Sequence, residues 1–404
     1  MPNETEDYNN AVRAALPSGM TFSGDRYRYN NHSFSPYKLA AWYYYYILRT
    51  GGGVPTFSPA SLFAASEQGV WYDPSDLTTL FQDSAGTTPV TATGQTVGLM
   101  LDKSGRGNHA TQATTASRPT YGVVPLGGRR NLLLATDTMA TQSSTVTAAA
   151  HTLSFTGTGT VTLTGASVAG PLVGTGAGNR VSLTFTPTAG SLTLTVVGSV
   201  TFAQLELGST ATDYQKVTTA FNVTQAGVAS LSYLSFDGVD DSMVTNTITP
   251  AIDKAQVFAG VRKVSTVIGV IAEHSAITDN NNGTMMLLGN WGGRGGFRSK
   301  GTVPADANVP FSGAIETLVM TGVGDIAGDV AAIRFNGSER PWATTDQGTG
   351  NYLAYPLYIG RRGGTTLPFN GQLYSLIVRF GANLTTGTIT STETYVAGKT
   401  GVTL

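Results

Sequence analysis

The sequence contains no cysteine, and charged residues make up only 12% of its 404 residues. Without cysteine the chain forms no disulfide and no thiolate metal site, so its stability depends on burial and hydrogen bonding. No run reaches the roughly 18 apolar residues of a membrane-spanning helix, which predicts no membrane insertion. The net charge of −1 offers no basic surface to a phosphate backbone, which argues against a nucleic-acid partner.

The residues that common catalytic sites need are also missing or scattered. Neither the G-x-S-x-G turn of hydrolases nor a histidine pair with zinc spacing occurs. Sandwich glycosidases place paired carboxylates on one groove. Here acids within four residues of each other lie only in terminal or turn-like stretches, among them Asp237, Asp240 and Asp241. The sequence therefore predicts that the protein is not an enzyme.

Short alternating segments dominate what is present. Val161-Thr162-Leu163-Thr164 and Leu192-Thr193-Leu194-Thr195-Val196 alternate apolar and polar residues, as strands with one buried face do. Turn signals such as Asn336-Gly337 separate the runs. The pattern predicts an all-β protein, with one short helix near residues 391–397.

Two stretches carry a family resemblance. Residues 102–111 read D-x-S-G-x-G-N-x-A-T, and residues 234–241 read L-x-F-D-G-V-D-D, a strand that ends in a tight turn. Together with W-Y-D-P-S-D from Trp71, they resemble laminin-G-like domains of tailed-phage virion proteins. The resemblance implies a concanavalin A-like jelly-roll sandwich running from Trp71 to the C-terminus.

A second module interrupts this sandwich. Residues 131–217 begin with N-L-L and close with A-Q-L-E-L-G-S-T-A-T-D-Y, which is similar to carbohydrate-binding-module-like sandwiches inserted into phage tail proteins. The predicted organisation is an N-terminal virion-docking segment (1–55), the first part of the jelly roll (56–130), the inserted β-sandwich (131–217) and the second part of the jelly roll (218–404).

The N-terminal segment is set apart by its aromatic residues. Its densest stretch carries Tyr37, Trp42, Tyr43, Tyr44, Tyr45 and Tyr46. One interpretation is a segment packed on its own domain; the other is a short anchoring arm that docks to the particle through these side chains, because large aromatic surfaces anchor interfaces. Residues 1–7 are acidic and lack a signal-peptide layout, so assembly in the host cytoplasm is expected.

Ligand candidates come from turns. Trp291 and Trp342, with Arg294 beside the first, are the candidate carbohydrate-binding residues, and ordinary loop packing is the alternative explanation for the two tryptophans. The resemblance implies that calcium, if any cofactor is bound, is held by Asp102 and Asp237. Aspartates that cap turns need no metal, and that alternative stays open.

The resulting hypothesis is a non-enzymatic virion component, a fibre, tail or head appendage. Its expected partners are other virion proteins, further copies of itself as a homo-oligomer, and a host-surface glycan. The alternatives are a free carbohydrate-binding or glycan-cleaving protein, and a capsid decoration protein without a ligand.

Overall fold

A computed structural model of the chain describes residues 21–23, 26–29, 32–34, 57–277, 281–290, 292–313, 315–340 and 343–404. The chain divides into two units, Met1–Phe57 and Ser58–Leu404. The described residues of the first unit form one antiparallel sheet of β1 (Thr21–Ser23), β2 (Arg26–Tyr29) and β3 (His32–Phe34). The predicted docking residues from Tyr37 to Tyr46 lie outside the described residues.

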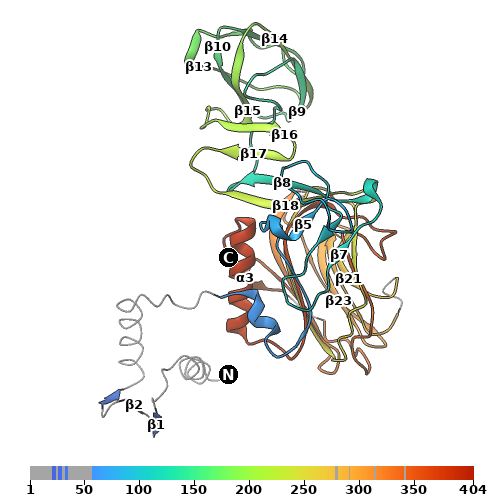
Figure 1. The fold of residues 1–404 in the computed structure, drawn as a ribbon. Helices are drawn as coiled ribbons and strands as arrows, with labels where there is room; N and C mark the ends of the chain where they lie inside the picture. The colour runs from blue at the N-terminus through green and yellow to red at the C-terminus, as the bar shows by residue number, and fades with distance from the viewer. Residues whose placement is uncertain are drawn as a thin grey trace. The chain divides into compact units, whose positions relative to one another are not determined.

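Two large sheets make up most of the second unit (Figure 1). The ten-stranded sheet runs in the order β16 (Gln215–Thr219), β17 (Asn222–Gln225), β8 (Thr120–Pro125), β18 (Ser230–Asp237), β29 (Asn370–Phe380), β20 (Lys254–Lys263), β25 (Glu316–Asp325), β26 (Val330–Phe335) and β27 (Ser338–Glu339), with β4 (Gln68–Tyr72) also paired to β29. The nine-stranded sheet runs in the order β24 (Pro304–Pro310), β23 (Arg294–Lys300), β22 (Thr284–Asn290), β21 (Gly269–His274), β28 (Leu357–Ile359), β19 (Met243–Thr245), β7 (Ala110–Thr111), β6 (Leu99–Met100) and β5 (Leu80–Phe81). Three short 3₁₀ helices, η1 (Pro59–Phe63), η2 (Leu77–Thr79) and η3 (Thr115–Ser117), lie between strands.

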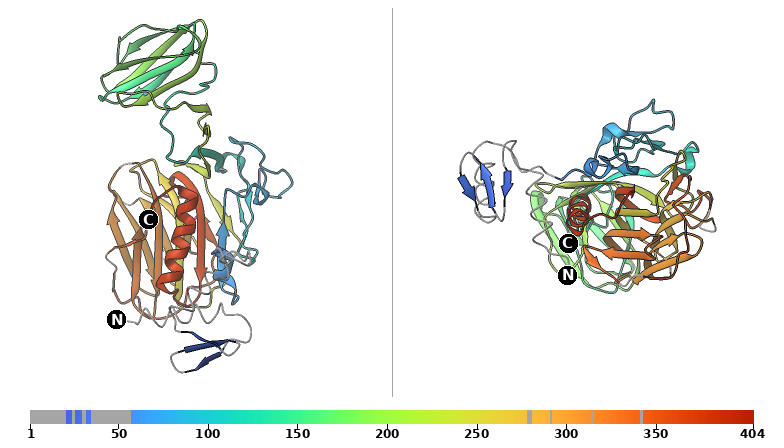
Figure 2. Two further views of the ribbon diagram at one scale, coloured as in Figure 1. Left: turned by 90° about the vertical axis from the view of Figure 1, so that its left-hand side faces the viewer. Right: turned by 90° about the horizontal axis from the view of Figure 1, so that it is seen from below.

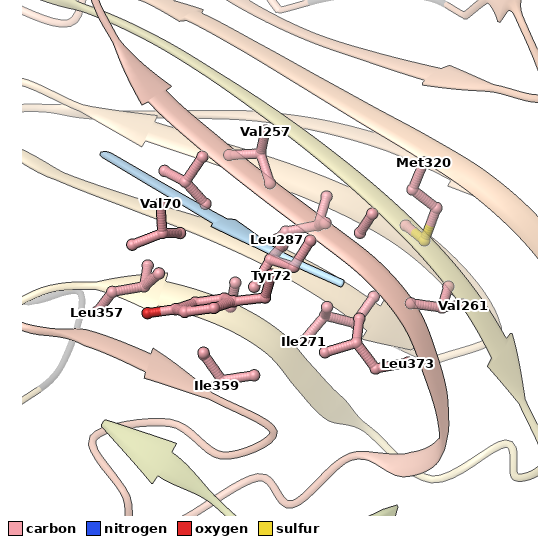
Figure 3. Close-up of a cluster of buried hydrophobic side chains, with 14 of the residues drawn as sticks. Val70, Tyr72, Val257, Val261, Ile271, Leu287, Met320, Leu357, Ile359 and Leu373 are labelled. Atoms are coloured by element: carbon pink, nitrogen blue, oxygen red, sulfur yellow. The ribbon is translucent and has the colours of Figure 1, made fainter. Parts of the chain in front are cut away.

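The inner faces of these two sheets share one hydrophobic core. Figure 3 shows Val257 and Leu373 of the first sheet among Ile271, Leu287 and Ile359 of the second. Each of these side chains is buried, as expected when alternate residues of a strand point to opposite faces. Burial of this apolar surface is the main term that holds the two layers together.

One α-helix, α3 (Thr386–Thr400), covers the outer face of the first sheet, where it contacts β20, β25 and β29 (Figure 2). The helix is longer than predicted. Its sequence is rich in threonine, a weak helix former, so only its centre is recognisable, whereas its ends are fixed by an N-cap at Thr385 and a left-handed glycine at Gly401. None of the helices in the described ranges has the length and apolar character that crossing a bilayer requires.

Between β8 and β16 the chain forms a second, smaller sandwich with its own core. Leu153, Phe155 and Leu194 are fully buried there. One sheet has the order β13 (Gly176–Phe185), β10 (His151–Gly157), β15 (Val200–Leu207); the other has the order β12 (Leu172–Val173), β11 (Thr160–Gly165), β14 (Gly190–Val197), β9 (Gln142–Val146). The predicted fold class, an all-β sandwich with a second β-sandwich inserted, is therefore confirmed.

The hairpin of β16 and β17 follows this inserted sandwich and belongs to the large sheet. β16 pairs with β17, and β17 pairs in parallel with β8 through Asn222 and Val123. Because β16 begins at Gln215, the predicted boundary at residue 217 falls inside a strand. The hairpin thus brings residues just after the inserted sandwich next to residues at its base.

Candidate functional site

An open groove of about 600 Å³ lies at the base of the inserted sandwich. Its lining combines two aromatic rings with charged, amide and hydroxyl side chains: Asp137, Phe202, Tyr214, Lys216, Thr224, Gln225 and Ala226. The volume is within the range of small-molecule sites, which are mostly apolar with a few placed polar groups. The groove is therefore the candidate functional site.

Phe202 is presented to the groove by a β-bulge. Ser154 of β10 pairs with Gln204 of β15, but Thr156 pairs with Thr201, so two residues of β15 stand where β10 has one. The bulge puts Phe202 at a φ of 50°, a left-handed conformation that costs a non-glycine residue on the order of 1–3 kcal/mol. The ring is nevertheless 49% exposed. The bulge thus presents an aromatic ring to the groove at a cost in backbone strain.

The floor of the groove is held by hydrogen bonds around Thr136. Its backbone N–H donates to Val217 O at 3.0 Å, and Ala203 N donates to Thr136 O at 2.9 Å, so this segment joins β16 to β15. The hydroxyls of Thr136 and Tyr214 lie 2.7 Å apart. These bonds fix the Tyr214 ring, whose centroid lies 5.4 Å from that of Phe202 in an edge-to-face arrangement.

The two charges of the groove neutralise each other. Lys216 Nζ forms an ion pair with Asp137 Oδ2, and the Tyr214 hydroxyl donates to Asp137 Oδ1 at 3.1 Å. Burial and the nearby Asp137 carboxylate raise the pKa of Tyr214 to about 12, so its hydroxyl is protonated at neutral pH. Both oxygens of Asp137 are thus engaged within the groove wall.

The phrase A-Q-L-E-L-G-S-T-A-T-D-Y, which signalled the end of the inserted module, forms the network behind this wall. The amide of Gln204 donates to Glu206 Oε1 at 2.6 Å, and the Thr212 hydroxyl bonds the other Glu206 oxygen at 2.5 Å. Arg130 lies 3.6 Å from Glu206 and donates to Gln225 Oε1 at 2.6 Å. The motif therefore ends the inserted sandwich and, through Arg130, positions the lining residue Gln225. The motif's sequence alone does not reveal this role.

Of the three predicted carbohydrate residues, the structure describes only Arg294, which does not line this groove. Trp291 and Trp342 lie outside the described residues. Arg294 begins β23 as an exposed side chain that donates to Asn308 Oδ1 at 2.9 Å. Phe202 and Tyr214 were missed because they lie in a strand and at a strand end, whereas the prediction considered tryptophans in turns.

Asp102, one of the two predicted calcium ligands, organises a loop. Its carboxylate accepts from the backbone N–H groups of Trp71 (2.9 Å), Ser104 (2.8 Å) and Asn108 (3.1 Å), and from the Ser104 hydroxyl (2.6 Å). These bonds tie the Gly-rich stretch to β4. The calcium prediction for Asp102 stays a prediction.

Asp237, the other predicted ligand, lies in a carboxylate cluster. One carboxylate oxygen each from Asp237, Asp240 and Asp241 lies within 4.8 Å of the others. Asp237 Oδ1 accepts from Val239 N, Asp240 Oδ2 from the Ser117 hydroxyl, and Asp241 Oδ2 from Asp237 N. Each carboxylate keeps one oxygen that bonds nothing in the described part of the chain. Such a donor set suits calcium, which prefers oxygen ligands.

The cluster predicts a pH dependence of stability. Burial, together with the charges of Asp237 and Asp240, raises the pKa of Asp241 from 3.8 to about 7. A carboxyl whose pKa is higher in the folded state stabilises that state at low pH, and this contribution is lost as pH rises through 7. Asp241→Asn should therefore gain stability relative to the natural protein, by on the order of 2 kcal/mol, between pH 4 and pH 8.

Urea unfolding of both proteins across that range measures the difference. Glu273, whose pKa burial also raises to about 7, is present in both proteins and cancels in the comparison. If the stabilities of the two proteins changed in parallel with pH, the pKa of Asp241 would not be raised by its surroundings, and the prediction would be wrong.

No protein-family model matches the chain, and no curated protein matches its sequence. Similar solved structures include the CBM40 of the Ruminococcus gnavus IT-sialidase bound to alpha2,6 sialyllactose, with 16% identity, a TM-score of 0.29, and coverage of 35% of this chain and 84% of that one. The botulinum neurotoxin serotype D binding domain is 11% identical, with a TM-score of 0.33 and coverage of 41% and 42%. At these values the likeness identifies no ligand or activity here.

Proposed function

We propose that this protein is a non-enzymatic component of a bacteriophage virion that binds host-surface glycans through the groove at the base of its inserted sandwich. The observation that carries the glycan part is Phe202, exposed on a strained bulge and facing hydroxyl and amide side chains. A sugar ring has a face of C–H groups edged by hydroxyls. An aromatic ring beside polar side chains is complementary to it.

Binding of the purified full chain to a glycan array tests this proposal. We expect weak binding by a single copy, strengthened when several copies are displayed together, because linked sites act at high effective concentration. Failure to bind any glycan in either form contradicts it. Release of reducing sugar from a bound glycan would favour the glycan-cleaving alternative, and the Asp237–Asp241 cluster would be the first place to mutate.

The proposed virion role rests on the resemblance of the jelly-roll sequence motifs to laminin-G-like domains of phage virion proteins, and on the aromatic N-terminal segment. A chain that lacks residues 1–55 should not be incorporated when phage particles assemble, because the aromatic arm would be missing. Unchanged incorporation would contradict docking through this arm. The copy number per particle distinguishes a fibre or tail appendage from a decoration protein that covers the capsid.

Calcium is proposed as a ligand of the carboxylate cluster, with Asp237, Asp240 and Asp241 supplying oxygens. Added calcium should raise the melting temperature of the natural protein by a few degrees, since a ligand that binds only the folded state stabilises it. Asp241→Asn should remove most of that rise, whereas Asp83→Asn, at an exposed carboxylate that only caps its own loop, should keep it. An equal rise in both variants would place calcium elsewhere.

A further inference from the structure

Resting on the proposed glycan function, we infer that the groove selects uncharged sugars and discriminates against sugars that carry a carboxylate. The charged side chains at the groove, Lys216, Asp137 and Arg130, are already bound to partners within the protein. It narrows the ligand class from glycans in general to neutral hexoses and N-acetylhexosamines presented at a host surface.

The cation of the groove is already paired. Among the described residues that line it, Lys216 is the one basic residue, and its ammonium group is bound to Asp137. Because Asp137 lies against Lys216, a sugar carboxylate that approaches Lys216 also approaches the Asp137 charge. The two carboxylates repel each other, which offsets the attraction to Lys216, so the ligand carboxylate loses water without meeting an uncompensated positive charge. A carboxylated sugar is therefore penalised.

Arg130, which bonds the lining residue Gln225, is committed as well. Arg130, which lies behind Gln225, donates to Thr212 Oγ1, Asp213 O and Gln225 Oε1, and lies 3.6 Å from Glu206. Glu206 is buried, so if Arg130 turned towards a ligand it would leave that carboxylate with neutral hydrogen-bond donors and without its positive charge, which is costly.

The remaining polar groups suit neutral hydroxyls. The Gln225 side-chain nitrogen and the Thr224 hydroxyl make no hydrogen bond within the described residues, and both line the groove. An amide and a hydroxyl can donate to or accept from sugar hydroxyls and acetamido groups without any net charge. Because the exposed Phe202 ring lines the same groove, the groove offers apolar contact and uncharged hydrogen bonds.

The affinities for lactose and sialyllactose test the inference, because the two sugars share a neutral core and differ by one carboxylated sugar. Other matched pairs of neutral and acidic glycans on an array extend the comparison. The natural protein should bind the neutral member more tightly. Asp137→Asn, which keeps an acceptor for Tyr214 but frees Lys216, should shift the ratio of affinities towards the acidic member by about two- to fivefold. Asp213→Asn changes the net charge equally, and no ion pair of Asp213 is lost, so it should leave the ratio unchanged.

The outcomes separate this inference from the proposed function. Glycan binding with a preference for carboxylated sugars, or an unchanged ratio in Asp137→Asn, would overturn the inference and leave glycan binding intact. Absence of binding to every glycan would overturn the proposed function and this inference with it. Equal shifts in both variants would trace the effect to net charge and would also overturn the inference.

Discussion

Glu393→Ala is expected to lower the free energy of unfolding by about 3 kcal/mol. Glu393 projects from α3 onto the outer face of the large sheet, where its carboxylate is 1% exposed. It accepts two hydrogen bonds from Arg334 of β26, from Nε at 2.8 Å and from the terminal Nη2 at 3.2 Å. Removing the carboxylate leaves a largely buried guanidinium with only the exposed Glu339 as its counter-charge, which is costlier than losing the bond itself.

Glu339 provides the matched control. It also pairs with Arg334, at 3.4 Å, but its side chain is 63% exposed. Exposed ion pairs contribute at most about 1 kcal/mol, so Glu339→Ala should be nearly neutral. Chemical denaturation of the two variants gives both values. Equal losses, or a neutral Glu393→Ala, would mean that α3 is not fixed to the sheet by this pair.

Phe202→Gly should weaken glycan binding at least about tenfold, because an exposed aromatic ring that lines a binding groove contributes a large share of the binding energy. The same change should leave the melting temperature unchanged or raised. Glycine accepts the φ of 50° without strain, and this offsets the lost contact with Tyr214. Loss of binding without loss of stability is the signature of strain kept for function.

Leu207→Ala is the control for that variant. Leu207 lies on the same strand, is 63% exposed and does not line the groove. Isothermal titration with a glycan chosen from the array should give the natural affinity for this variant. If Phe202→Gly also binds with the natural affinity, the groove is not the binding site.

Much of the fold can be predicted from the sequence because apolar and polar residues alternate along strands that bury one face. In β11, Val161 and Leu163 are buried while Thr162 and Thr164 are exposed, as the pattern predicts. The strand before the Asp237-Gly238 turn is also as predicted, with Gly238 at a φ of 76°. Local patterns of this kind need no knowledge of distant partners.

The groove could not be predicted in the same way. Its lining comes from a loop at Asp137, a bulge in β15 and the hairpin of β16 and β17, and no periodicity links them. A bulge inserts one residue into a strand and turns Phe202 outwards without any change in composition. The convergence of Asp240 and Asp241 on Asp237 likewise depends on the turn geometry, which the acidic residues alone do not specify.

The most direct test of the central claim is to locate a bound neutral glycan in a crystal structure of the complex with the full chain. The account predicts the sugar ring against Phe202, with hydroxyls near Thr224 and Gln225 and with the Asp137–Lys216 pair intact. A glycan bound at another surface, with the Phe202 groove vacant in the same crystal, would contradict it.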